Sequence, residues 1–276
     1  MKTRIIVAAI GLPLIIAVVL LAPAFVLGIM FAIISALCAW EFMKAISPDT
    51  PKRYYIYPVI SAALIPLAQG SIFAGIYFFR ALVFVTVLLL TVELIFSVRS
   101  KHGKIPLSAL AFAITCGLVF PYMLSSIVRL KLSDLGWPLA FLPFIIAFSS
   151  DAGGYFFGMA FGKHKLAPHL SKNKTIEGGA GGIISAAAFM LIYYFVLKAA
   201  GYTASIPILI LYGITGSVIC QLGDICFSAV KREGQIKDFG TLIPGHGGML
   251  DRFDSMHFTA AFIEIMVFLL PAIWVK

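Results

Sequence analysis

The chain has 276 residues, of which 61% are hydrophobic and only 12% are charged, and its mean hydropathy is +1.02. A soluble domain carries about 25% charged residues, so this chain has too few polar groups to cover a water-facing surface. The net charge of +9 does not indicate nucleic-acid binding, because the basic residues are spread over loops between apolar runs. The composition therefore predicts a membrane protein and excludes a soluble one.

The apolar runs predict an all-α, polytopic integral membrane protein with about nine transmembrane helices. A helix needs ~20 residues to cross the hydrocarbon core, and several runs reach that length. The first run is longer than the apolar part of a usual signal peptide, so we expect it to be retained. Residues 1–276 form one predicted membrane domain, with N-terminal helices in 1–135 and catalytic helices and loops in 136–276. The predicted spans are 5–22, 24–44, 54–70, 74–98, 106–128, 138–161, 180–200, 205–230 and 255–275.

The distribution of basic residues predicts the orientation of these spans. With the N-terminus inside, the inner segments hold sixteen Lys and Arg residues and the outer segments hold five. This bias places the N-terminus on the cytoplasmic side. The two longest inner segments, 162–179 and 231–254, are rich in Lys, His, Asp and Gly. Because function concentrates in loops held by a rigid scaffold, we expect a polar cavity that faces the cytoplasm.

The four cysteines lie inside or beside apolar segments. Their spacing matches neither a disulfide framework nor a zinc site. We interpret them as small buried hydrophobic residues. They are Cys38, Cys116, Cys220 and Cys226.

The eighth span carries a stripe of polar residues at helical spacing. Ser217, Gln221, Asp224, Ser228 and Lys231 recur at steps of four, three, four and three, which places them on one helix face. An ionisable group near mid-bilayer costs about 2.5–3.5 kcal/mol on insertion scales, so this face cannot point to lipid. The stripe therefore lines a water-filled cavity or meets polar groups on neighbouring helices.

The sixth span holds Asp151, followed by Gly154, Gly158 and Gly162 at steps of four. Asp151 is either paired with a Lys or Arg in the bundle or is a floor residue of the cavity. The glycines favour close helix packing. The stretch 158–163 is not a nucleotide-binding P-loop, because it is too short and lacks the following Ser or Thr.

A second acidic group stands at the entry to the ninth span. Asp251, Asp254 and His257 are three residues apart and share a face if the segment is helical. Together with Asp224, these carboxylates would repel one another unless cations neutralise them. Lys and Arg side chains could do so alone. Carboxylate oxygens with open positions also suit Mg²⁺, which is usually completed by substrate phosphates.

Two glycine-containing loops resemble anion-binding elements. The segment Pro244–Gly248 surrounds His246 with three glycines, which allows tight turns and close approach of N–H groups to an anion. The alternative is a plain turn between helices, with His246 as a hydrogen-bonding loop residue. The basic loop 164–179 either contacts lipid headgroups or binds phosphate near a helix N-terminus.

These motifs together resemble a known family. The 27-residue segment from Ser228 to Asp254 contains Ser-Ala-Val-Lys-Arg, Lys-Asp-Phe-Gly and Ile-Pro-Gly-His-Gly-Gly-Met-Leu-Asp-Arg-Phe-Asp. It is similar to the full signature of the CDP-diacylglycerol synthases, or phosphatidate cytidylyltransferases. Gly223-Asp224 and the run from Asp151 to Gly178 also resemble that family. The resemblance covers about the C-terminal half, whereas the first half matches only as apolar spans.

The resemblance implies a reaction and roles for individual residues. The family condenses CTP with phosphatidic acid to CDP-diacylglycerol and pyrophosphate, requires Mg²⁺, and is described with a second cation such as K⁺. It implies that metal is held by Asp224, Asp251 and Asp254, and that Asp151 and Gln221 belong to the cavity. The implied catalytic residues are Asp224, Asp251, Lys231, Lys237 and His246. The implied substrate-binding residues are Lys172, Lys174, Arg232, Arg252, Ser228, Gly247 and Gly248.

The expected partners are CTP, phosphatidic acid and the lipid bilayer, with no nucleic acid, and a homodimer is left open. The expected location is the bacterial inner (plasma) membrane, with the active site facing the cytoplasm. Three alternatives remain open at this stage. A transporter would spread its polar groups through the bilayer and show paired repeats. Another Mg²⁺-dependent lipid-phosphate transferase, or a CTP-dependent polyprenol kinase, would share the Asp clusters.

Overall fold

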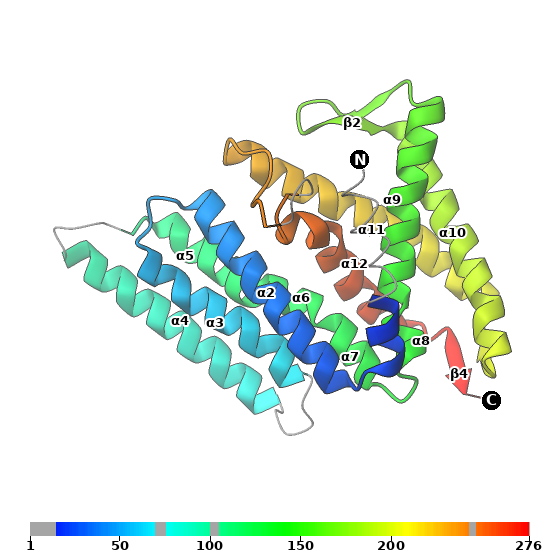
Figure 1. Ribbon diagram of the computed structural model, residues 1–276, viewed down its shortest axis with the longest axis horizontal. Coiled ribbons are helices and arrows are strands. Elements are labelled where there is room, and N and C mark those ends of the chain that lie inside the picture. The colour runs from blue at the N-terminus through cyan, green and yellow to red at the C-terminus, as the bar shows by residue number, and fades with distance from the viewer. Residues whose placement is uncertain (1–14, 70–75, 100–104, 243–246, 276) are drawn as a thin grey trace. The chain divides into compact units, whose positions relative to one another are not determined.

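The computed structural model describes residues 15–69, 76–99, 105–242 and 247–275. The chain divides into two compact units, Met1–Arg129 with Gly234–Phe253, and Leu130–Glu233 with Asp254–Lys276. Within the described residues, both units are built from helices, and the strands form two short two-stranded sheets (Figure 1). The all-α prediction is therefore confirmed.

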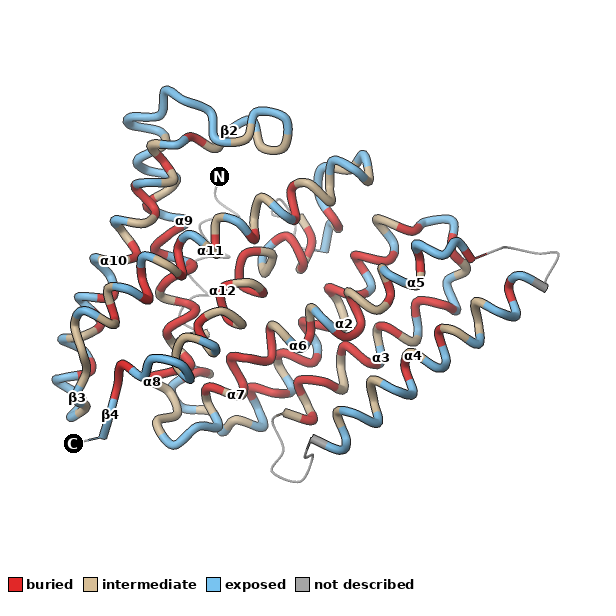
Figure 2. Tube along the Cα trace, turned by 180° about the vertical axis from the view of Figure 1, so that it is seen from behind, coloured by how far each residue is buried: buried red, intermediate tan, exposed pale blue. Residues whose placement is uncertain are grey.

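The helices of the first unit pack mainly against two neighbouring helices, α2 and α3. Its elements are α2 (Ala24–Ile46), α3 (Lys52–Gln69), α4 (Ile76–Arg99), α5 (Leu107–Ile114), the π-helical turn η1 (Thr115–Val119), α6 (Phe120–Leu124) and the start of α7 (Ser126–Leu132). Figure 2 shows buried positions along α2 and α3, whereas α4 presents a largely exposed surface. Phe42 lies at the centre of this core, because its ring contacts Phe112, Phe120 and Phe239.

The second unit is organised by α9, α10 and α11. Its elements are α8 (Trp137–Ala140), α9 (Leu142–Phe161), β1 (Lys165–Ala167), β2 (Ser171–Thr175), α10 (Ile176–Ala199), β3 (Tyr202–Ala204), α11 (Ile206–Glu233), most of α12 (Leu250–Leu269) and β4 (Ile273–Val275). The strands β1 and β2 form an antiparallel hairpin between α9 and α10. The strands β3 and β4 pair in the same sense, with Thr203 opposite Trp274.

Glycines bring α9 and α10 close together, as the four-residue spacing predicted. A Cβ added at Gly178 would lie 2.8 Å from the Gly154 carbonyl oxygen and 3.2 Å from Gly158 Cα. A Cβ at Gly158 would lie 3.1 Å from Thr175 Oγ1. The two backbones therefore touch at Gly178, where a side chain would push the helices apart.

Six helical segments of the described chain are long and apolar enough to cross a membrane: Ala24–Ile46, Tyr77–Val98, Leu107–Leu132, Trp137–Phe161, Ile176–Ala199 and Ile206–Glu233. The protein is therefore a multi-pass membrane protein, and the count of nine spans is not confirmed. Residues 15–21 are helical, and the rest of the predicted first span lies outside the described residues. Residues 52–69 and 250–269 are also helical, at the predicted third and ninth spans.

The predicted ninth span, 255–275, is wrong at its end. The helix stops at Leu269, and residues 273–275 form β4. Pro271 explains the stop, since proline lacks the N–H that a helix interior needs and disfavours helical backbone at the residue before it. The interpretation of all four cysteines as buried is also wrong for Cys226, which is exposed, whereas Cys38, Cys116 and Cys220 are buried.

Candidate active site

The polar stripe of α11 meets polar groups on α9 and α10. Ser217 is fully buried, and its hydroxyl lies 2.8 Å from the hydroxyl of Ser150 on α9. The Gln221 side-chain amide donates to the Gly179 carbonyl of α10 at 3.0 Å and to the Ser217 hydroxyl at 3.2 Å. The stripe thus ties three helices together through hydrogen bonds, which removes the cost of burying unpaired polar groups.

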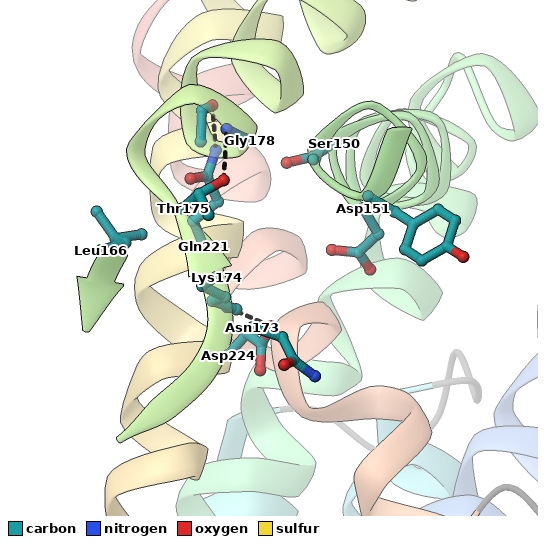
Figure 3. Close-up of a pocket in the computed structure, with 12 residues that line it drawn as sticks. Ser150, Asp151, Leu166, Asn173, Lys174, Thr175, Gly178, Gln221 and Asp224 are labelled. Atoms are coloured by element: carbon teal, nitrogen blue, oxygen red, sulfur yellow. Dashed lines mark hydrogen bonds and ion pairs between the residues drawn. The ribbon is translucent and has the colours of Figure 1, made fainter. Parts of the chain in front are cut away.

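Next to this network, the same stripe contributes polar side chains to a pocket of about 290 Å³. The Lys174 ammonium of β2 pairs with the Asp224 carboxylate of α11, and both side chains are partly exposed. Figure 3 shows Asp151 of α9 on the opposite wall, with Gln221 and Asp224 on α11 and Lys174 on β2. Asp151 is therefore a pocket residue, as one of its two sequence interpretations stated, and one of its oxygens lies 3.9 Å from the Cys220 sulfur.

The β1–β2 hairpin is held by side chains at both of its ends. The Thr175 hydroxyl caps α10 by accepting from the Gly178 N–H at 3.1 Å. Glu177 accepts from the His164 N–H, and its carboxylate lies 2.6 Å from His164 Nδ1. At the turn of the hairpin, the Arg232 guanidinium of α11 donates to the Leu170 carbonyl at 3.2 Å. The predicted phosphate-binding Lys174 is thus carried on an anchored hairpin, and Lys172 lies exposed on the same strand.

The last turns of α11 face an acidic residue of α12, Asp254. The Lys231 ammonium lies 3.8 Å from the Asp254 carboxylate, and both side chains are largely buried. Burial and the nearby Asp224 carboxylate raise the pKa of Asp254 to about 7, although Lys231 opposes this shift. Ser228 is buried on the same face of α11. The charges of Asp224 and Lys231 therefore both act on the Asp254 carboxylate.

The remaining predicted residues belong to the first unit, in the segment that follows α11. Asp251 is 8% exposed, and its Oδ2 accepts from the Phe239 N–H at 2.9 Å and the Gly248 N–H at 3.0 Å. Gly247 adopts a φ of 84°, which an L side chain rarely takes. Asp251 therefore ties residues 237–242 to residues 247–249, and these two segments are together called the signature loop. His246 lies outside the described residues.

Lys237 lines a second pocket, of about 640 Å³, between this loop and the end of α2. Its other charged lining residues are Glu41, Lys44 and Asp238. Arg252 is exposed on the first turn of α12. Asp251, Asp254 and His257 all lie in α12, so their predicted helical arrangement is confirmed. The expectation that Asp251 shares a cavity with Asp224 stays a prediction.

Sequence reasoning missed Glu41, which contacts this loop from α2. Glu41 is 7% exposed, and its Oε2 accepts from the Leu250 N–H at 2.9 Å. Cβ atoms added at Gly240 and Gly248 would lie 2.6 Å and 2.7 Å from the carboxylate carbon of Glu41. A signal was available, since Glu41 is an acidic residue within a predicted apolar span, and such residues need a reason.

In the parts of the chain that the structure describes, no group of three or more His, Cys, Asp or Glu side chains is gathered as metal ligands would be. The Asp224 carboxylate contributes, after burial, to the raised pKa of Asp254. Two neighbouring carboxylates with Lys nearby fit the oxygen donors that Mg²⁺ takes together with substrate phosphates. The magnesium site stays a prediction.

Comparison with known proteins defines the class of protein. The model of the cytidylyltransferase family matches residues 2–270, which is nearly the whole chain. The chain therefore belongs to the cytidylyltransferase family.

The chain is similar to several proteins named phosphatidate cytidylyltransferase. That of Bacillus subtilis is 37% identical over 197 residues, covering 70% of this chain and 69% of that protein. That of Haemophilus influenzae is 37% identical over 174 residues, covering 60% of this chain and 59% of that protein. That of Staphylococcus haemolyticus is 41% identical over 124 residues, and the match spans only 46% of its length.

Proposed function

We propose that this chain is a phosphatidate cytidylyltransferase, which joins CTP and phosphatidic acid to give CDP-diacylglycerol and pyrophosphate. The observation that carries the proposal is that the chain belongs to the cytidylyltransferase family. It is a multi-pass membrane protein, and one of its pockets is lined by Asp151, Lys174, Gln221 and Asp224. A lipid substrate requires access from the bilayer, and a nucleotide requires access from water. A pocket lined by polar side chains and built between helices long enough to cross a membrane supports this proposal.

The reaction needs positioning and charge neutralisation rather than covalent catalysis. A phosphate oxygen of phosphatidic acid forms a bond with the α-phosphorus of CTP. The bond from that phosphorus to the bridging oxygen of the β-phosphate breaks, and pyrophosphate leaves with the electron pair. The attacking phosphate is already ionised at neutral pH, so a strong general base is unnecessary.

The chain's own residues supply fixed charge around the transferred group. Lys174, anchored on the hairpin next to Asp224, and Lys231, next to Asp254, place ammonium groups beside the acidic positions. Such preorganised cations stabilise the charge that develops on the phosphates. Asp224, Asp254 and Asp251 are the proposed holders of Mg²⁺, which would polarise the phosphoryl oxygens when bound. A second cation such as K⁺ belongs to the same proposal.

Two differently labelled forms of CTP test this function against its alternatives. Purified protein is incubated with Mg²⁺, phosphatidic acid, a polyprenol and CTP labelled either at the α- or at the γ-phosphate. Cytidylyl transfer moves only the α-label into the lipid phase, with release of pyrophosphate. A CTP-dependent polyprenol kinase moves the γ-label into polyprenol, and a transferase with another nucleotide moves neither. Absence of the α-label from the lipid would overturn the proposal.

Two variants connect the activity to the pocket. Asp224→Ala removes the carboxylate that pairs with Lys174, and we expect activity to fall at least 100-fold, as for loss of a transition-state electrostatic group. Lys198→Ala is the matched control, because Lys198 is an exposed charge near the end of α10. Full activity in Asp224→Ala would contradict the assignment of this pocket.

We also propose that the pocket faces the cytoplasm at the plasma membrane, because the basic residues of the inner segments favour that side. Lys172→Cys on the hairpin, in a Cys226→Ser background, places one exposed thiol near the pocket, since Cys38, Cys116 and Cys220 are buried. A membrane-impermeant maleimide should label it in inverted vesicles but not in intact spheroplasts. The opposite pattern would reverse the orientation. A homodimer is part of the proposal and is checked by the mass of the purified protein in detergent.

A further inference from the structure

The structure links an acidic residue of α2 to the signature loop, although the two are 209 residues apart in the chain. The Glu41 carboxylate accepts from the Leu250 N–H at 2.9 Å, at the first residue of α12. Glu41 is 7% exposed, so this hydrogen bond is made away from bulk water. An acidic side chain in an apolar helix is costly unless it is satisfied, and the backbone N–H at the start of α12 satisfies it.

Two glycines of the signature loop provide the space for this carboxylate. The three atoms nearest to a Cβ added at Gly248 are the carboxylate carbon and both oxygens of Glu41, and the same carboxyl group crowds a Cβ at Gly240. Neither glycine has a positive φ, so backbone conformation does not require glycine at these positions. A methyl group at either place would therefore displace the Glu41 carboxylate from its present position.

The loop held in this way carries Lys237 and leads into Asp251 on the first turn of α12. Asp251 binds the N–H groups of Phe239 and Gly248, next to the glycines that surround Glu41. Phe239 is buried against Phe42, the residue after Glu41, with ring centroids 5.8 Å apart. Lys237 lines the same pocket as Glu41. The position of the loop is thus set from α2 on one side and from Asp251 on the other.

We infer that Glu41 is a positioning residue for the transferase reaction: its carboxylate fixes the signature loop so that Asp251 and Lys237 are held in their working orientation. The inference rests on the proposed function. It extends the site to the N-terminal half of the chain. Residues that orient ligating or charged groups contribute about 10- to 100-fold to activity or metal affinity in other sites.

The inference is tested by removing the side chain at position 41 and adding a methyl group at position 248, separately and together. Glu41→Ala should lower kcat about 10- to 100-fold per folded molecule. Glu41→Gln keeps an acceptor oxygen at nearly the same volume and should retain more activity than Glu41→Ala. Gly248→Ala should also lose activity, because its methyl group meets the carboxylate. The double variant Glu41→Ala, Gly248→Ala should recover activity relative to Gly248→Ala alone, since the methyl group then occupies vacated space.

Glu93→Ala is the control, because Glu93 is another acidic residue of an apolar helix in the same unit and pairs with Arg53. It should keep kcat within about two-fold of the wild type. The inference is overturned if Glu41→Ala has wild-type kcat and KM per folded molecule, or if the losses of the two single variants simply multiply in the double variant.

Hydrogen exchange separates this inference from the proposed function. In Glu41→Ala, the amide of Leu250 should exchange faster than in the wild type, whatever reaction the protein catalyses. Faster exchange in a protein that forms no CDP-diacylglycerol would refute the proposed function and keep the role of Glu41 in holding the loop. Unchanged exchange in an active protein would refute the role of Glu41 alone.

Discussion

Replacement of Asp251 separates its role in the loop from its predicted role as a metal ligand. Its Oδ2 accepts two backbone N–H groups, from Phe239 and Gly248, and the side chain is 8% exposed. Each buried donor left without a partner costs about 1–3 kcal/mol, so Asp251→Ala should destabilise the protein by about 2–6 kcal/mol. Asp251→Asn keeps an oxygen that can accept both bonds and should cost much less.

Thermal unfolding of the purified protein in detergent measures this difference. A loss of 1 kcal/mol lowers the Tm of a chain of 150–250 residues by about 2–4 °C, so Asp251→Ala should melt at least about 4 °C below the wild type. A Tm within 1 °C of the wild type would refute the loop-closing role. If Asp251 also binds Mg²⁺, Asp251→Asn will require more Mg²⁺ for half-maximal activity while it keeps a nearly normal Tm. An unchanged requirement would contradict the ligand assignment.

Three further predictions concern the hairpin and the helices that carry it. Lys174→Met should lower kcat/KM for CTP by about 10- to 100-fold, as expected for loss of a charge-assisted contact. Lys174→Arg should lose less activity. Equal activity of Lys174→Met and the wild type would exclude a role of Lys174 in binding CTP. Thr175→Ala removes the cap of α10 and should destabilise the protein by about 1 kcal/mol, seen as a lower Tm. Gly178→Ala should destabilise the protein by about 1–3 kcal/mol. Gly154→Ala should not, because its Cβ would lie 3.6 Å from its nearest neighbour. Equal Tm values for the two variants would contradict the close packing of α9 against α10.

The sequence correctly predicted which regularly spaced polar residues and glycines share a helix face. The stripe from Ser217 to Lys231 lies on one continuous helix, α11, and its members meet α9, α10, the hairpin and α12. The glycines of α9 pack against α10 as their spacing indicated. Both predictions succeed because a helix converts steps of three and four residues directly into a common face.

Strands and contacts that have no regular spacing in the sequence were not predicted. The segment 165–175 is polar and largely exposed, so it has no alternation of apolar and polar residues that would indicate strands. The short apolar run Ile273–Val275 cannot be told from the end of a helix by hydropathy alone. Glu41 was missed because its partner lies 209 residues away and no local pattern connects the two.

The close approach of α9 and α10 has a consequence for the pocket. Where Gly154, Gly158 and Gly178 meet, the helices are separated by backbone atoms, so no side-chain rotamer can widen the gap. The hairpin that carries Lys174 connects the end of α9 to the start of α10. The main-chain positions of Asp151 on α9 and Lys174 on β2 are therefore held relative to each other by backbone contacts rather than by the packing of large side chains.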